Sequence, residues 1–191
     1  MSKIRIAVVI GNPSAKSRTK VLAQAISARL ADGLAGQLPV QIQTLEIANL
    51  APALLTGGWP AELPADGAAA VRAIEAADLI VAVTPVYKGS YTGLFKHLFD
   101  LVSPDALVGR PVLLAANGGS DRHALVVDHQ LRPLFSFFRA LTVPSSVYAA
   151  ESYFDGYTIR SPALQARIGE AAEQAVALII QKAHAKHLLA A

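Results

Sequence analysis

The chain has 191 residues, of which 53% are hydrophobic and 16% are charged, so it can bury the core of one full domain. It has no cysteine, which excludes disulfide bonds, thiol nucleophiles and thiolate metal sites. The net charge of +3 comes from scattered cations without interleaved aromatic residues, which argues against nucleic-acid binding. The apolar runs are too short to span a membrane, and the N-terminus has no secretion signal, so we expect a cytoplasmic protein.

Apolar runs of strand length alternate along the chain with longer helical patterns, which is typical of βαβ units. In chain order we expect a strand over 4–10, a helix over 19–30, a strand over 40–45, an irregular excursion over 48–64, a helix over 66–76, a strand over 79–83, a helix over 91–101, a strand over 112–116, a helix over 124–138, a strand over 143–148 and a helix over 162–186. This alternation predicts an α/β fold: a flavodoxin-like doubly wound sheet of five parallel strands in the order 2-1-3-4-5, in a single domain over 1–191. Right-handed crossovers then bring the loops after the first, third and fourth strands to one edge of the sheet, where ligands bind in such folds.

The loop after the third strand, residues 84–93, has the sequence TPVYKGSYTG and directly follows an apolar run. Pro85 and Tyr87 offer flat contact surfaces, and Gly89 leaves backbone N–H groups accessible. A planar, electron-accepting ring would suit this loop.

The loop after the first strand, residues 11–19, matches neither the dinucleotide-binding fingerprint nor a Walker A loop. It still contains what a phosphate site needs, because Ser14, Ser17 and Thr19 offer hydroxyls while Lys16 and Arg18 offer positive charge. The N–H groups at the start of the following helix would contribute to the same site. The structural alternative is that Ser17 or Thr19 only caps that helix.

The loop after the fourth strand begins Asn117-Gly118-Gly119-Ser120. Its two glycines allow the backbone to approach a ligand closely, and Asn117 can hydrogen bond to the edge of a ring. The alternative is a tight turn into a helix that Ser120 or Asp121 caps.

Three stretches together resemble the NADPH-dependent FMN reductase family: residues 11–19, residues 84–93, and the stretch from residue 116 onward with its Gly-Gly-Ser-x-x-His…Asp-x-x-Leu-Arg-Pro pattern. The resemblance covers about residues 4–150. Within the family, the chain is most similar to the flavin reductases that supply reduced FMN to two-component alkanesulfonate monooxygenases. This implies a flavodoxin-like fold, a homodimer or homotetramer, and reduction of FMN by NADPH or NADH for a separate FMNH2-dependent monooxygenase in sulfonate or organosulfur metabolism.

The resemblance also implies roles for individual residues. Ser14, Ser17 and Thr19 would hold the FMN phosphate, and Arg18 would add positive charge. The residues implied to line or flank the isoalloxazine ring are Pro85, Val86, Tyr87, Lys88, Gly89, Ser90, Asn117, Gly118, Gly119 and Ser120.

Three positions in the implied cofactor-binding loops depart from the family pattern: Asn12 replaces a common serine, Ala15 a frequent arginine, and Asn117 a usual threonine. A further position concerns the helix over 124–138, because some of these reductases carry an inserted residue there that forms a π-type bulge. Alignment of the Asp-x-x-Leu-Arg-Pro pattern puts His129 at that insertion, where it could gate flavin exchange. The alternative is an ordinary surface or interface histidine.

The expected chemistry is hydride transfer from a nicotinamide nucleotide to FMN, which requires no acid or base from the protein. We therefore name no certain catalytic residue, although Lys88 and the N–H groups near Gly89 would stabilise negative charge on the reduced ring. Two other functions compete with this one. The first is a reductase with bound FMN that acts on quinones, azo dyes or metal ions, and the second is a non-enzymatic flavodoxin-like electron carrier.

Two other kinds of site are weaker hypotheses. Ser90, His123 and Asp128 could form a hydrolase triad, but the nucleophile elbow G-x-S-x-G is absent. The acidic and histidine residues within 121–129 lack a recognised metal-ligand spacing, so we expect no metal site. Asp128 is better explained by an ion pair with Arg132, four residues further along the helix.

The low charge and the apolar side chains also predict a homo-oligomer. Trp59 lies in the Pro/Gly-rich excursion, and Leu131, Leu134, Phe135 and Phe138 lie on the fourth expected helix. We expect these residues to offer more apolar surface than one small sheet can cover, so that copies of the chain associate with closed symmetry.

Overall fold

A computed structural model describes the backbone of residues 3–189 and the side chains of residues 3–185, so the first two and the last two residues of the expected 1–191 domain lie outside the described part. The main sheet is parallel, with the order β2-β1-β3-β4-β5 and with β6 beside β4. Its strands are β1 (Ile4–Ile10), β2 (Val40–Glu46), β3 (Leu79–Pro85), β4 (Pro111–Gly118), β5 (Leu141–Thr142) and β6 (Val147–Ala150). The predicted α/β fold and its strand order 2-1-3-4-5 are confirmed.

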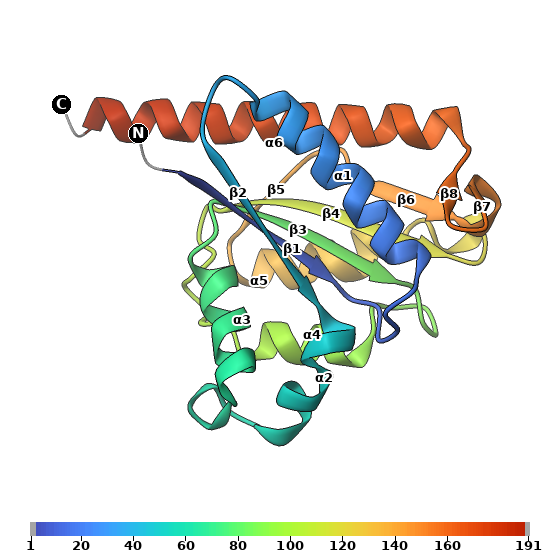
Figure 1. Cartoon of the computed structure of the whole chain (residues 1–191), viewed down its shortest axis with the longest axis horizontal. Helices are drawn as coiled ribbons and strands as arrows, with labels where there is room; N and C mark the ends of the chain where they lie inside the picture. Colours follow the sequence, from blue (N-terminus) through green and yellow to red (C-terminus); the bar gives the residue numbers. More distant parts are fainter. Residues whose placement is uncertain (1–2, 190–191) are drawn as a thin grey trace.

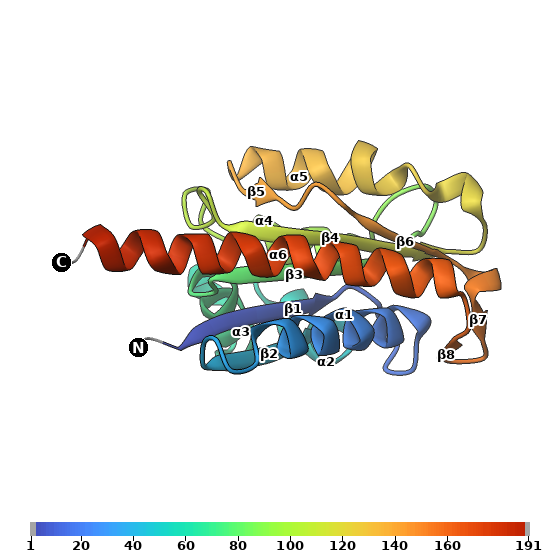
Figure 2. The ribbon, with the colours of Figure 1, turned by 90° about the horizontal axis from the view of Figure 1, so that it is seen from above.

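Helices cover both faces of the sheet and make three layers, as Figures 1 and 2 show. The helices are α1 (Arg18–Leu34) and α6 (Pro162–Leu189) on one face, and α2 (Ile47–Thr56), α3 (Ala65–Glu75), α4 (Gly93–Asp100) and α5 (Arg132–Phe137) on the other. Alternate residues of each strand enter the two cores. In β1, Ile6 and Val8 pack with α1 and α6, whereas Ala7 and Val9 pack with the opposite helices. This two-sided burial explains why the central strands read as unbroken apolar runs.

The expected irregular excursion over 48–64 is wrong in its first half, because α2 forms there. Ile47 and Leu54 of α2 are fully buried, and Leu50 packs partly buried against the same core. This helical spacing of apolar residues stabilises α2 although Pro52 lies inside it. The second half keeps one short 3₁₀ turn, Pro60–Glu62.

The expected fifth strand over 143–148 is divided into β5 and β6, both beside β4. Pro144 lies in the interruption, and a proline has no N–H to donate to a sheet. At this interruption the Ser145 N–H donates to Gln174 Oε1 (2.8 Å), and Ser145 Oγ donates to Glu170 Oε1 (2.7 Å). The second hydrogen bond lowers the pKa of Glu170. Both bonds attach the interruption to α6.

A small hairpin, β7 (Phe154–Asp155) with β8 (Thr158–Ile159), precedes α6 and was not expected. Gly156 opens its two-residue turn with a φ of 59°, a conformation that favours glycine. In the described part of the chain, no helix combines the length and the apolar composition that crossing a membrane requires.

Candidate functional site

The carboxyl ends of β1, β3, β4 and β6 lie at one edge of the sheet because these strands are parallel. The three loops singled out from the sequence therefore converge there, together with the segment that follows β6. Figures 1 and 2 show the β7–β8 hairpin at this same end, close to the start of α1. Doubly wound sheets bind ligands at this kind of edge.

Gly11 directly follows β1 at this edge and connects three elements of the fold. Its N–H donates to Val83 O (2.7 Å), and its carbonyl accepts from Thr92 Oγ1 (2.7 Å), so it connects β1 with β3 and with the N-cap of α4. A Cβ at this position would lie 2.8 Å from Phe95 Cδ2 and 3.0 Å from the Thr84 side chain. Only glycine allows β1 to end so close to α4.

The first loop combines a helix cap with exposed polar groups. Ser17 has extended backbone, and its Oγ accepts from the Lys20 N–H (3.1 Å), so Ser17 caps α1 as expected. Ser14 is exposed, whereas Asn12 is buried and donates from Nδ2 to Ser14 O (2.7 Å). Thr19 is also buried, and it donates its only O–H to Asn117 Oδ1 (2.7 Å). Thr19 and Asn117 thus join the first loop to the third.

The cations of the first loop are held by the segment after β6. Arg18 Nη1 lies 2.9 Å from Glu151 Oε1, and Arg18 Nε donates to Gly156 O (3.1 Å). The ammonium of Lys16 lies 4.8 Å from the centre of the Tyr157 ring. The β7–β8 hairpin, which the sequence patterns did not predict, therefore packs against the expected phosphate loop.

The loop after β3 contains a tight turn in which Tyr87 and Ser90 exchange both backbone hydrogen bonds (2.9 and 3.1 Å). Its two central residues, Lys88 and Gly89, have φ values of 51° and 84°, the pattern of a type I′ turn. Such a φ is uncommon for lysine and costs about 1–2 kcal/mol relative to glycine. Lys88 and Gly89 are exposed, and Tyr87 is half-exposed and donates from its hydroxyl to Asn12 Oδ1 (3.4 Å). The turn presents a cation and an aromatic ring at the sheet edge.

The Pro85 and Val86 positions connect this turn to the third loop. Pro85 is buried at the end of β3, and the Val86 N–H donates to Asn117 O (2.8 Å). A Cβ on Gly118 would lie 2.5 Å from Tyr148 Oη, whereas one on the exposed Gly119 would meet nothing within 4 Å. The absence of a side chain at Gly118 thus leaves room for the Tyr148 hydroxyl. The space beside the Gly119 Cα is open, so a ligand can approach the backbone there.

The Ser120 side chain makes no capping hydrogen bond to the 3₁₀ turn that follows it, Asp121–His123, so the capping alternative is wrong for Ser120. Its carbonyl instead accepts from the Tyr148 hydroxyl (2.6 Å). Burial, with a smaller contribution from the charge of Asp121, raises the pKa of Tyr148, so this phenol remains a donor at neutral pH. Asp121 accepts from the Tyr153 hydroxyl (3.1 Å), and that hydrogen bond raises the pKa of Tyr153. Two tyrosines thus fix the third loop.

The expected helix over 124–138 contains the π-type turn that the alignment implies, over Val127–Leu131 and with His129 in it. The Arg132 N–H donates to Val127 O, five residues earlier. His129 is exposed, and its gating role stays a prediction. The next residue, Gln130, accepts from Ser90 Oγ (3.0 Å), so the π-type turn contacts the loop after β3 directly.

The competing sites receive little support. A hydrolase triad would need Ser90 and Asp128 to hydrogen bond with His123. Ser90 instead donates to Gln130, and Asp128 pairs with Arg132 at 2.9 Å. Within residues 3–185, the structure places no group of three or more histidine, aspartate or glutamate side chains where they could hold a metal ion.

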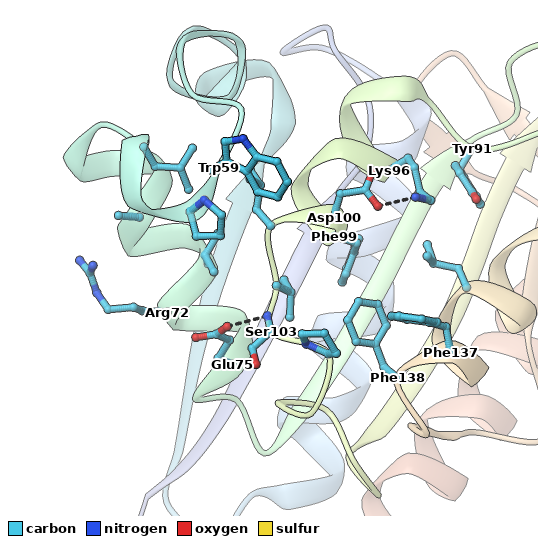
Figure 3. Close-up of a pocket in the computed structure, with 18 residues that line it drawn as sticks. Trp59, Arg72, Glu75, Tyr91, Lys96, Phe99, Asp100, Ser103, Phe137 and Phe138 are labelled. Carbon is cyan, nitrogen blue, oxygen red and sulfur yellow. Dashed lines mark hydrogen bonds and ion pairs between the residues drawn. The ribbon is translucent and has the colours of Figure 1, made fainter.

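A separate apolar groove lies on the face that α3, α4 and α5 cover (Figure 3). It encloses about 800 Å³, and Trp59 and Phe137 on its walls are 71% and 68% exposed. The apolar residues expected to be exposed on the fourth helix are mostly not: Leu131, Phe135 and Phe138 are buried in the chain's own core, and Leu134 is partly buried. The exposed aromatic residue of that helix is Phe137, which sequence reasoning missed.

Sequence reasoning also missed Glu151, Tyr157, Tyr148 and Gln130, which contact the predicted site residues. The Gly156-Tyr157 pair, with glycine at the first turn position, was an available signal for a hairpin after β6. The contacts of Tyr148 and Gln130 depend on packing between distant segments, and no local pattern marks them.

The residues at this edge fit FMN. Exposed Ser14, the capped start of α1 and nearby cations match a phosphate, while the Tyr87 turn and the open side of Gly119 match a flat ring. The Ser17 hydroxyl still has its proton to donate, because it serves the Lys20 N–H as an acceptor.

Comparison with known proteins identifies the family of this chain. The model of the NADPH-dependent FMN reductase family matches residues 4–155. The chain is 50% identical over 186 residues to the NADH-dependent FMN reductase SfnF of Pseudomonas fluorescens, covering 97% of this chain and 96% of that protein. It is 49% identical over 177 residues to an FMN reductase (NADPH) of Pseudomonas aeruginosa, covering 93% of each. A solved oxidoreductase from Corynebacterium diphtheriae has a TM-score of 0.85 and 37% identity, covering 94% of this chain and 99% of that one. The chain belongs to the NADPH-dependent FMN reductase family.

Proposed function

We propose that this protein transfers hydride from NADH or NADPH to FMN and releases the reduced FMN to a separate monooxygenase. As a member of the FMN reductase family, the chain is an oxidoreductase that uses FMN and a nicotinamide nucleotide. The observation that carries the proposal is the meeting, at one sheet edge, of the hydroxyl-rich start of α1 with the exposed Tyr87–Ser90 turn.

The first loop is assigned to the FMN phosphate. Ser14 and Ser17 offer O–H donors, and the first turn of α1 adds N–H groups and the positive end of the helix dipole. Lys16 and Arg18 supply charge close to these donors. Thr19 has a positioning role here, because its hydroxyl is already donated to Asn117.

The second and third loops are assigned to the ring. FMN, when bound, supplies the electron-accepting ring to which the nicotinamide nucleotide delivers hydride. Val86 and Tyr87 offer contact surface, and Asn117, Gly118 and Gly119 flank the other edge. The Lys88 ammonium and the N–H groups of Lys88 and Gly89 stabilise negative charge there, while Ser90 is held by Gln130.

The partner and the nucleotide are inferred from relatives. SfnF, which is named as NADH-dependent, and the P. aeruginosa enzyme, which is named for NADPH, are almost equally similar to this chain, so similarity favours neither nucleotide. The resemblance to the reductases of two-component alkanesulfonate systems supports a monooxygenase in sulfonate or organosulfur metabolism as the recipient of reduced FMN.

We further propose that the chain forms a homo-oligomer through the apolar groove of Figure 3. Trp59 and Phe137 expose large apolar surfaces beside Leu134 and Tyr91, and such patches are unusual on monomers. A dimer or a dimer of dimers would cover them.

The test is the oxidation of NADH and of NADPH by purified protein, measured with and without added FMN, FAD and riboflavin. We expect oxidation that requires added flavin, saturates with it and is fastest with FMN. Oxidation that needs no added flavin but requires a quinone or an azo dye would instead establish the reductase with bound FMN.

A further inference from the structure

Glu151 lies at the site edge and has no role in the proposed function. It follows β6 directly and begins the 3₁₀ turn Glu151–Tyr153. Its carboxylate lies 2.9 Å from Arg18 Nη1, while Gly156 O accepts from Arg18 Nε at 3.1 Å. The guanidinium at the first residue of α1 is therefore held at two points by the segment after β6.

The position of Glu151 is fixed by neighbours that belong to the site. β6 pairs with β4 in register, with Ala150 opposite Gly118. Two residues after Glu151, Tyr153 donates to Asp121 of the third loop. Glu151 thus sits on a turn that is anchored to the third loop, with its carboxylate directed at the first.

The charges around the start of α1 are largely compensated. Lys20 pairs with Glu46 through contacts of 2.7 and 3.0 Å, and Arg18 pairs with Glu151. The Lys16 ammonium lies over the aromatic ring of Tyr157 and has no ion-pair partner in the described part of the chain. A phosphate that reaches this loop must therefore share Arg18 with Glu151, and its charge comes close to a carboxylate of the same sign.

We propose that Glu151 is a specificity-determining residue that competes with the FMN phosphate for Arg18 and so keeps the flavin exchangeable. The inference rests on the proposed function, in which FMN is a substrate. When FMN enters, Arg18 turns at least partly from the Glu151 carboxylate to the phosphate. When reduced FMN leaves, Glu151 takes the guanidinium back, so that the cation is not left without a partner. Both side chains can make this exchange, because they are 35% and 57% exposed.

The variant that tests this is Glu151→Gln, which keeps the shape of the side chain and removes its charge. The dissociation constants of FMN and of riboflavin, which lacks the phosphate, are measured by flavin fluorescence titration, and FMN release is timed by stopped flow. We expect the variant to bind FMN about threefold to tenfold more tightly and to release it more slowly, with riboflavin binding unchanged.

Two further variants serve as controls. Asp105→Asn removes the same charge from an exposed pair with Arg139 next to the amino end of β4, and we expect it to leave both dissociation constants unchanged. Arg18→Gln removes the cation that the two anions share, so adding Glu151→Gln to it should tighten FMN binding less than Glu151→Gln does in the parent.

The outcomes separate the inference from the proposed function. A parent protein that binds FMN no better than riboflavin contradicts the phosphate site on which the inference rests. A parent that prefers FMN, together with a Glu151→Gln variant whose FMN affinity is unchanged or lower, overturns the inference alone, since Glu151 would then be inert or would orient Arg18 towards the phosphate.

Discussion

Gly11→Ala is the substitution for which the structure gives the clearest expected cost. The added Cβ would lie 2.8 Å from Phe95 Cδ2 and 3.0 Å from the Cβ and Oγ1 atoms of Thr84. Normal carbon contacts are about 3.5–4.0 Å, so one of these groups must move by roughly 0.5–1 Å. Phe95 is fully buried, with ring centres 5.9 Å from Tyr91 and 4.9 Å from Phe99, and it cannot retreat without displacing those rings.

Overpacking of this kind costs about 1–3 kcal/mol of unfolding free energy, or roughly 2–12 °C in melting temperature for a chain of this size. Urea and thermal unfolding followed by circular dichroism measure both quantities. Gly119→Ala is the matched control, because its Cβ meets nothing within 4 Å, and we expect it to stay within about 0.5 kcal/mol of the parent. Adding Phe95→Leu should make Gly11→Ala less costly. A Gly11→Ala variant as stable as the parent would refute the close approach of β1 to α4.

The remaining predictions concern ligand binding, assembly and exchange. Ser14→Ala should weaken FMN binding about twofold to tenfold and leave riboflavin binding unchanged in fluorescence titrations; an equal loss for both flavins would remove Ser14 from the phosphate site. Lys88→Asn, which tolerates the positive φ, should lower kcat about threefold to thirtyfold with unchanged thermal unfolding, and an unchanged kcat would end the proposed electrostatic role. Light scattering should give a dimer or tetramer mass for the parent and a smaller mass for Phe137→Asp, whereas a fully active parent monomer would contradict the oligomer. Deletion of His129 should restore a regular helix, so that the purified variant retains more flavin and oxidises NADPH with free FMN more slowly; equal values would make His129 an ordinary helix residue.

The sheet and the three loops could be predicted because their signals are local. The unbroken burial of β3 gives an apolar run of strand length, and Ser17 precedes a helical pattern and caps it. Parallel strands then bring the loops that follow β1, β3 and β4 to one edge without further information.

The parts that were missed have only short local signals or depend on packing between distant segments. The strands of the β7–β8 hairpin have two residues each, which is too short for an alternation of apolar and polar residues to be recognised. Their turn nevertheless contacts the site, because Gly156 O accepts from Arg18 Nε. In the fourth helix, the π-type turn adds one residue, which rotates all later side chains by about 100° relative to a regular α-helix. Leu131, Phe135 and Phe138 keep regular helical spacing, and that spacing does not tell whether their shared face packs in the chain's own core or against another copy.

The most direct test of the account is an anaerobic reduction of FMN by NADH or NADPH, with FMN in large molar excess over the protein. If FMN is a substrate that enters and leaves, all the FMN loses its oxidised absorbance, and the reduced flavin passes through an ultrafiltration membrane that retains the protein. Reduction that stops at one FMN for each protein chain, with the flavin retained, would contradict the account and show that FMN is a resident cofactor.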